Sequence, residues 1–255
     1  MPLWVRIELD GRARIGTVEG DIVHLHDGDL FGRPAPTPHT VAVADAHFLT
    51  PTEPTKMVAL WNNYRAAAEK NGWPVPAEPL YFIKTPNSFA AHRQPIAPPR
   101  AFDGRVVYEG ELGVVIGRRC TGVTVDDAPA HILGYTCVND LTAPELLQRD
   151  AAFAQWTRAK NFDGFGPFGP VVATGLDPMS LVVRTLVNGR ERQNYRCDDM
   201  IFRPAELVSR ISQDMTLEAG DVIACGTSLG VLPVRSGTTV EIAIDGIGTL
   251  SNLYG

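Results

Sequence analysis

The sequence lacks the features that mark membrane, secreted or nucleic-acid-binding proteins. No apolar run approaches the length of a membrane-spanning helix. The start, MPLWVRIELDGRARIG, has no basic segment followed by the apolar stretch of a signal peptide. The net charge is −6, and no run of Lys and Arg is longer than a pair such as Arg118-Arg119. We therefore expect no membrane and no nucleic acid among its partners.

Cysteine is scarce as well. The four cysteines lie far apart, with no C-x-x-C and no histidine at zinc-site spacing. Isolated thiols in a reducing cytoplasm are favoured over disulfides or a zinc site. The sequence thus predicts a cytoplasmic protein.

The 255 residues are enough for one large domain, or for one large and one small domain, and 44% of them are hydrophobic. Residues 3–9 and 14–25 are typical of short strands around turns at Asp10-Gly11 and Glu19-Gly20. A Pro-rich stretch follows, then a run without clear pattern to Pro54. We predict a small N-terminal β-rich domain over residues 1–53 and a catalytic domain over residues 54–255.

The second part also contains many strands and few helices. The expected helices are 65–72, ended by Gly72, and 143–158. The expected strands are 56–61, 81–84, 105–117, 171–174, 181–188, 222–225 and 238–250. A doubly wound sheet would alternate strand and helix regularly, so this pattern predicts a β-rich α+β fold.

Three carboxylates occupy unusual places in apolar strands. In VVYEGELGVVIG (106–117), Glu109 and Glu111 are two residues apart and share a strand face, where they repel each other and resist burial. Asp140 ends the apolar run ILGYTCVND. A bound cation would remove these costs, and three carboxylates suit Mg²⁺ or Mn²⁺ better than Zn²⁺. The alternative is an edge strand whose two glutamates face solvent.

Several sequence blocks resemble, in order, those of the fumarylacetoacetate hydrolase family. They cover about residues 56–250. The blocks are NNYRAAAEKNG, PLYFIKTPNS, YEGELGVVIG, GYTCVNDLTA, RAKNFDGFGPFGP and GDVIACGTSLG. The resemblance implies a mixed β-sandwich roll, a homodimer, and Mg²⁺ or Mn²⁺ at the site.

The resemblance also assigns residues by position. It makes Glu109, Glu111 and Asp140 the metal ligands and Lys160 the active-site lysine. It makes the pair Gly226-Thr227 a loop that binds the substrate carboxylate through a backbone N–H and a hydroxyl. A small 2-oxo acid would chelate the metal, and Lys160 would add positive charge near the developing enolate. Without the resemblance, a solvated surface lysine is the default interpretation of Lys160.

A Gly-rich motif in the sequence does not indicate a dinucleotide site. Residues 164–169 satisfy G-x-G-x-x-G literally, but Pro167 and Pro170 interrupt the segment and a strand follows it. A dinucleotide site requires a strand before the glycines and a helix after them. These glycines indicate a tight turn beside Lys160, and no organic cofactor is expected.

The family includes C–C hydrolases, decarboxylases and isomerases, so departures from its pattern decide the expected reaction. Hydrolytic members typically carry a His and a Glu, three residues apart, on a lid helix. The resemblance puts these places on Ala67 and Lys70. Glu69 is one residue off register and points about 100° away on a helix. The usual water-activating base is therefore missing.

These departures make the chain look more like the branch of the 2-hydroxyhepta-2,4-diene-1,7-dioate isomerase and 5-oxopent-3-ene-1,2,5-tricarboxylate decarboxylase. We expect decarboxylation and/or keto–enol isomerisation of an unsaturated 2-oxo (di)acid from aromatic catabolism. The first alternative is an acylpyruvate C–C hydrolase assisted by Glu69 or Lys70. The other alternative, from a different class, is a binding protein without catalysis.

Three more residues are candidate substrate contacts. Arg65 follows the Asn-Tyr pair and could bind a distal carboxylate when the lid closes, although a solvated helix face is equally compatible with it. Gln148 lies close to the place where many members carry a substrate-binding Gln. Tyr108 is a plausible contact, but an aromatic residue in a β-rich core needs no such role.

Overall fold

Strands dominate the fold, which a computed structural model describes for residues 2–255. The strands are β1 (Leu3–Leu9), β2 (Arg12–Glu19), β3 (Ile22–Asp27), β4 (Ala35–Ala42), β5 (His47–Phe48), β6 (Met57–Trp61), β7 (Leu80–Lys84), β8 (Phe89–Ala90), β9 (Val106–Val107), β10 (Gly110–Ile116), β11 (Ile132–Asn139), β12 (Gly166–Ala173), β13 (Val182–Val187), β14 (Arg190–Arg196), β15 (Val222–Ala224), β16 (Pro233–Val234), β17 (Thr238–Ile244) and β18 (Gly248–Tyr254). The helices are α1 (Arg65–Asn71), α2 (Pro144–Leu147), α3 (Trp156–Lys160) and α4 (Pro204–Asp214), with short 3-10 turns η1 (Pro86–Ser88), η2 (Ala128–His131), η3 (Pro178–Ser180) and η4 (Cys197–Asp199). The predicted β-rich α+β class is confirmed.

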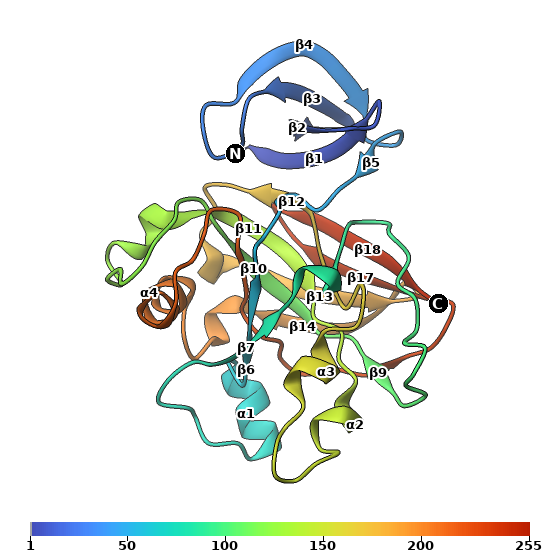
Figure 1. Ribbon diagram of the computed structural model, residues 1–255, viewed down its shortest axis with the longest axis vertical. Helices are drawn as coiled ribbons and strands as arrows, with labels where there is room; N and C mark the ends of the chain where they lie inside the picture. Colours follow the sequence, from blue (N-terminus) through green and yellow to red (C-terminus); the bar gives the residue numbers. More distant parts are fainter. Residues whose placement is uncertain (1) are drawn as a thin grey trace.

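The N-terminal strands form an antiparallel meander at one end of the molecule (Figure 1). Strand β1 also pairs with β12, with Leu3 opposite Ala173, so the meander extends the large sheet. The N-terminal segment therefore packs on the rest of the chain. Strand β4 falls in the Pro-rich stretch, where we expected no strand. It lies at the sheet edge, and an edge strand tolerates residues such as Pro36 and Pro38 because it needs fewer N–H donors.

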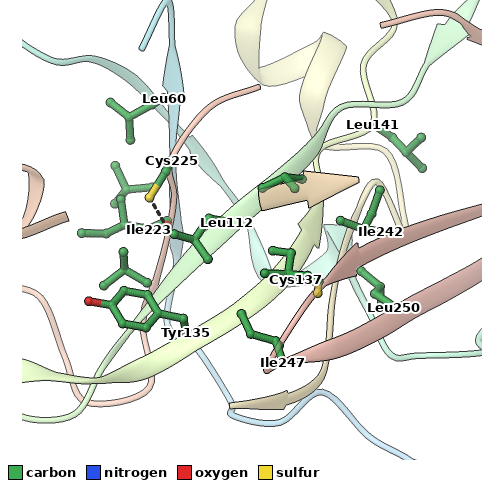
Figure 2. Packing of buried hydrophobic residues seen from close by; sticks show 14 of the residues in the cluster. Leu60, Leu112, Tyr135, Cys137, Leu141, Ile223, Cys225, Ile242, Ile247 and Leu250 are labelled. Atoms are coloured by element: carbon green, nitrogen blue, oxygen red, sulfur yellow. Dashed lines mark hydrogen bonds between the residues drawn. The ribbon is translucent and has the colours of Figure 1, made fainter. Parts of the chain in front are cut away.

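Two sheets pack against each other to form the core. In the part of the chain that the structure describes, the large sheet runs β4-β3-β2-β1-β12-β11-β10-β15-β6-β7, and a second sheet runs β14-β13-β17-β18. Figure 2 shows Leu112 and Cys137 of the first sheet in one hydrophobic cluster with Ile242 and Leu250 of the second. Burial of these apolar side chains is the main source of stability for such a sandwich.

Strand β10, which carries the predicted carboxylates, is central and buried throughout. It pairs with β11 on one side and β15 on the other. Leu112 and Val114 belong to the large core cluster, whereas Val115 belongs to a second cluster on the opposite face. The predicted alternation of faces is therefore confirmed, and the alternative of a solvent-facing edge strand is wrong.

Some predicted elements are divided in the structure. The expected strand 105–117 breaks at Tyr108-Glu109, where the Glu109 N–H donates to the Asn139 side chain instead of joining a ladder. The expected strand 238–250 is the hairpin β17–β18, which turns after Ile244. Its two strands need opposite directions to pair, a tertiary requirement that hydrophobic periodicity does not reveal.

The expected helix 143–158 is also wrong as a single element. It is two short helices, α2 and α3, separated by irregular backbone. The Asp150 side chain accepts from the Ala152 N–H at 2.8 Å, and such local bonds compete with helix continuation. Strand β14 and helix α4 were not predicted, although Pro204 at the first turn of α4 is a standard helix-start signal. Among residues 2–255, no helix is long and apolar enough to cross a membrane.

Candidate metal centre and active site

Two neighbouring strands, β10 and β11, bring the carboxylates together. Glu109 immediately precedes β10, Glu111 is its second residue, and Asp140 immediately follows β11. The antiparallel register places Gly110 opposite Asn139, so the start of β10 meets the end of β11. The Asp140 N–H donates to the Glu109 carbonyl at 2.8 Å, which continues the pairing past the strand end. The local sequence therefore brings all three side chains to one place.

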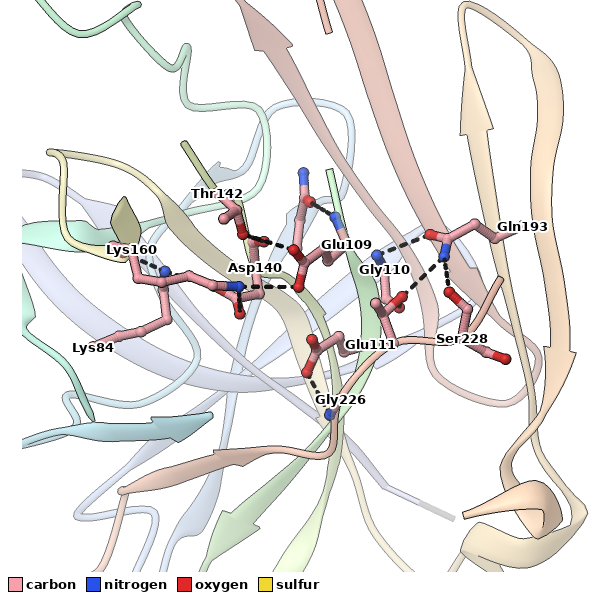
Figure 3. A network of polar contacts seen from close by, with 12 residues as sticks. Lys84, Glu109, Gly110, Glu111, Asp140, Thr142, Lys160, Gln193, Gly226 and Ser228 are labelled. Atoms are coloured by element: carbon pink, nitrogen blue, oxygen red, sulfur yellow. Dashed lines mark hydrogen bonds and ion pairs between the residues drawn. The ribbon is translucent and has the colours of Figure 1, made fainter. Parts of the chain in front are cut away.

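The carboxylates form a compact and buried cluster (Figure 3). One oxygen from each residue lies within 4.8 Å of the others. The side chains of Glu111 and Asp140 are fully buried, and that of Glu109 is 17% exposed. Within the described residues, Glu111 Oε1 is buried without a hydrogen-bond partner. An orphaned acceptor among hard oxygen ligands fits a divalent ion such as Mg²⁺ or Mn²⁺, so the predicted ligand set is compatible with this geometry.

Two lysines lie against the cluster. Lys160 Nζ, at the end of α3, donates to Glu109 Oε2 at 3.0 Å and to Asp140 Oδ2 at 2.5 Å. Lys84 Nζ, at the end of β7, lies 2.7 Å from Asp140 Oδ1 and donates to the Lys160 carbonyl. Lys160 is 3% exposed and Lys84 is fully buried. The interpretation of Lys160 as a solvated surface residue is wrong.

The pKa values follow from burial and from these pairs. Burial, together with the nearby charges of Asp140 and Glu109, raises the pKa of Glu111 well above its usual value. Burial alone would also raise the pKa of Asp140, but the two ammonium groups outweigh it and lower that pKa. For Lys160, burial lowers the pKa, yet Asp140 and Glu109 outweigh burial and raise it overall. The ion pairs with Asp140 and Glu109 therefore favour the charged form of Lys160 beside the cluster.

The loop after β15 completes the site, but its contacts differ from the expected ones. The Gly226 N–H donates to Glu111 Oε2 at 2.7 Å, and the Thr227 hydroxyl donates to the Gly110 carbonyl at 3.0 Å. These two donors stabilise the carboxylate strand in the structure. In this arrangement both donors are engaged within the chain, and their binding of a substrate carboxylate stays a prediction.

A cavity of about 310 Å³ reaches the cluster at Glu109, and several of the predicted residues line it. Glu109, Thr227 and Lys70 line it, as does Ala67. The residues at the two lid positions named by the resemblance thus face the cavity, and neither is a histidine or a carboxylate. The exposed side chain of Glu69 lies outside this lining.

The remaining candidate substrate contacts are not brought to the cavity. Arg65 is exposed at the start of α1, and Gln148 is exposed after α2. The ring of Tyr108 is buried in the core, and its hydroxyl donates to the Gly230 carbonyl at 2.8 Å. Because Gly230 lines the cavity, Tyr108 supports the cavity wall from behind.

The lid helix α1 is short and depends on tertiary contacts for its position. Asn63, just before it, donates to the Cys225 carbonyl at 2.8 Å and accepts from the Phe202 N–H at 2.9 Å. Gly72 ends the helix in the left-handed conformation, with φ of 67°, as the sequence predicted. The lid is thus attached directly to the strand that leads into Gly226.

Sequence reasoning missed two residues of the site. Lys84 ends the predicted strand YFIK, and its place in an apolar strand was the available signal. Gln193 donates to Thr227 Oγ1 at 2.9 Å and accepts from the Gly110 N–H at 3.0 Å. No local pattern marks Gln193, because its partners are 34 and 83 residues away.

Comparison with known proteins shows which family the chain belongs to. Residues 56–253 match the family described as fumarylacetoacetate (FAA) hydrolase C-terminal. The chain belongs to the fumarylacetoacetate hydrolase family. Residues 3–51 match the family described as Rv2993c-like, N-terminal. The fold is therefore the β-rich α+β fold of the hydrolase family with an Rv2993c-like N-terminal β domain.

Relatives within the fumarylacetoacetate hydrolase family carry several activities in their names. The structure of 2-hydroxyhepta-2,4-diene-1,7-dioate isomerase from Mycobacterium marinum matches with a TM-score of 0.90 and 36% identity, covering 100% of this chain and 98% of that one. Oxaloacetate tautomerase YisK of Bacillus subtilis is 38% identical, covering 85% of this chain and 75% of the relative. A 4-hydroxyphenylacetate degradation bifunctional isomerase/decarboxylase of Salmonella dublin is 38% identical over 77% of this chain and 46% of that protein. The chain is an enzyme of this family, with isomerase, tautomerase and decarboxylase relatives.

Proposed function

We propose that this enzyme catalyses decarboxylation and/or keto–enol isomerisation of a small unsaturated 2-oxo acid or diacid from aromatic catabolism. One observation carries the proposal. The cavity that reaches Glu109 has Ala67 and Lys70 on its lid side, where a C–C hydrolase of the family would carry a water-activating pair. An alanine cannot accept a proton, and a lysine favours the stabilisation of negative charge over the activation of water.

The chain's own residues have distinct roles in this proposal. Glu109, Glu111 and Asp140 would hold Mg²⁺ or Mn²⁺, which when bound supplies positive charge that polarises the keto acid. Lys160, fixed by ion pairs to Glu109 and Asp140, adds a cation that stabilises the enolate formed by loss of CO₂ or of a proton. Lys70 is the lid group that lines the cavity and can move a proton at the carbon beside the keto group.

The test is a product assay with added Mg²⁺ on oxaloacetate, an unsaturated 2-oxo diacid and an acylpyruvate. We expect CO₂ release or enol–keto conversion on the first two substrates, and little pyruvate from the third. An Asp140→Asn variant is the inactive control, and exposed Glu78→Gln is the matched neutral control. Cleavage of the acylpyruvate well above the other rates would favour the hydrolase instead. No metal-dependent turnover of any 2-oxo acid would favour a binding protein.

We further propose that the enzyme is a cytoplasmic homodimer, as the family resemblance implies. Light scattering on the purified chain tests the dimer directly. A monomeric mass at micromolar concentration would contradict it.

A further inference from the structure

Two tryptophans stand at the cavity on either side of the lid helix. Trp61 ends β6 before α1, and Trp73 follows the Gly72 cap after α1. Their ring centroids are 4.9 Å apart and the rings are tilted by 46°. Both side chains line the cavity that contains Glu109 and Thr227. The aromatic pair therefore flanks the lid helix and lines the cavity that reaches Glu109 of the carboxylate cluster.

The backbone fixes this pair in place. The Trp73 N–H donates to the Ala68 carbonyl at 2.9 Å, and the next residue's carbonyl accepts from the Asn62 side chain at 3.0 Å. Trp61 also meets Trp156, with centroids 6.3 Å apart, and Trp156 stacks on Phe82 at 5.0 Å. Trp61 and Trp73, which we call the aromatic wall, are therefore fixed by backbone hydrogen bonds and by aromatic packing.

The wall remains partly open despite this support. Trp61 is 36% exposed and Trp73 is 37% exposed. Leu60, Leu229 and Val231 extend the same apolar lining, whereas Lys70 is the one cationic residue among the described residues of this cavity. Exposure of the two indole faces to water is unfavourable, and a ligand that covers them gains free energy by removing this apolar surface from water.

We propose that Trp61 and Trp73 bind the tail of the 2-oxo acid, so that the enzyme prefers flat unsaturated or aryl tails over the carboxylate tail of oxaloacetate. This inference rests on the proposed function, since it assumes that the 2-oxo end lies at Glu109, Glu111 and Asp140. A flat conjugated tail packs on an indole face, whereas a carboxylate meets the negative face of the ring and loses water. The wall thereby sets the substrate class without any group that takes part in the chemistry.

The experiment compares phenylpyruvate, whose tail is a flat ring, with oxaloacetate in the Mg²⁺-loaded enzyme. We expect a higher kcat/KM for tautomerisation of phenylpyruvate. Trp73→Ala should lower that value roughly tenfold or more, while oxaloacetate turnover changes little. Trp61→Leu is the second variant, should Trp73→Ala fold poorly. Trp4→Leu, in the N-terminal domain against His26, is the matched control and should leave both substrates unchanged.

A binding measurement separates substrate contact from a catalytic effect. Calorimetric titration with 3-phenyllactate and with malate, which cannot tautomerise, should show tighter binding of 3-phenyllactate, and this preference should disappear in Trp73→Ala. Equal losses for both ligands would overturn the inference, as would oxaloacetate turnover exceeding that of phenylpyruvate. So would a Trp73→Ala variant with unchanged kinetics and an altered oligomeric mass, which would make the wall an interface between copies. Absence of turnover with both substrates would overturn the proposed function itself.

Discussion

The Gln193 carboxamide oxygen accepts from the Gly110 N–H at 3.0 Å, and Gly110 lies between Glu109 and Glu111. The carboxamide nitrogen of Gln193 donates to Thr227 Oγ1 at 2.9 Å. One buried side chain therefore joins the carboxylate strand to the loop that also contacts Glu111. Thr185 packs closely against Gly110 as well. A Cβ on Gly110 would lie 2.1 Å from Thr185 Oγ1, so only glycine fits there.

Replacing Gln193 should weaken metal binding without removing a ligand. In Gln193→Ala the buried Gly110 N–H loses its acceptor, which costs about 1–3 kcal/mol of unfolding free energy. Loss of outer-shell support should raise the Kd for Mn²⁺ roughly 10- to 100-fold. Calorimetric titration with Mn²⁺ and urea unfolding measure the two effects, with exposed Gln213→Ala as control. An unchanged Mn²⁺ Kd would show that Gln193 does not position the carboxylates.

Neutralising Glu111 should separate fold stability from metal binding. Its carboxylate is buried beside those of Glu109 and Asp140, so Glu111→Gln removes a like-charge repulsion and a desolvation cost. We expect the metal-free variant to melt at a higher temperature than the metal-free wild type. Added Mg²⁺ should raise the wild-type Tm and leave the variant's Tm nearly unchanged.

Thermal melts with EDTA and with Mg²⁺ test this prediction, and Glu78→Gln serves as the control. If metal-free Glu111→Gln melts below the wild type, the buried carboxylate is stabilising in its own right. That result would remove the reason for placing a cation there.

The carboxylate triad was predictable because its information is local. Two glutamates at strand spacing and an aspartate at the end of an apolar run are visible in the sequence, and the family resemblance joined them. Lys84 was not predicted, because a lysine at a strand end points to solvent unless a distant residue faces it. The partner here is Asp140, far along the chain, at 2.7 Å.

The fold, too, was predictable where the pairing partners are close in sequence and not where they are distant. Turn residues and alternation predicted β1, β2 and β3, whose pairing partners are adjacent in sequence. Strand β14 has a polar sequence, RERQNYR, and is a strand because it pairs with β13. The residues that line the cavity came together only through tertiary structure, and Trp61 and Trp73 belong to this group.

Removal of the Lys84 side chain should lower the free energy of unfolding more than removal of the Lys160 side chain. Lys84→Met leaves Asp140 Oδ1 buried without its ion-pair partner, which should cost roughly 3–5 kcal/mol of unfolding free energy. In either single variant the other lysine still pairs with Asp140. Lys84→Met also leaves the buried Lys160 carbonyl without its donor, whereas the second partner of Lys160, Glu109, is 17% exposed and can be hydrated. The loss of stability should therefore be smaller in Lys160→Met, while turnover is abolished. Urea unfolding in EDTA compares the variants, with exposed Lys70→Met as the stability control.

A double variant tests the cause. Asp140→Asn removes the buried charge that has lost one of its two ion pairs, so Lys84→Met combined with Asp140→Asn should be more stable than Lys84→Met alone. If the second substitution lowers stability further, the cost of losing Lys84 comes from packing and not from the ion pair.

His92 should make the stability of the protein fall in mild acid. Burial lowers its pKa from 6.5 to about 4, and its Nδ1 accepts from the Ser251 N–H at 3.1 Å. Between these pH values the unfolded chain binds a proton that the folded chain cannot, so the free energy of unfolding decreases as pH falls from 6.5 towards 4. A glutamine can accept the same hydrogen bond without titrating, so His92→Gln should reduce the slope of stability against pH by up to about one proton. Urea unfolding across this pH range measures the slope, with exposed His39→Gln as the control. If His92→Gln keeps the wild-type slope, other groups cause the acid sensitivity.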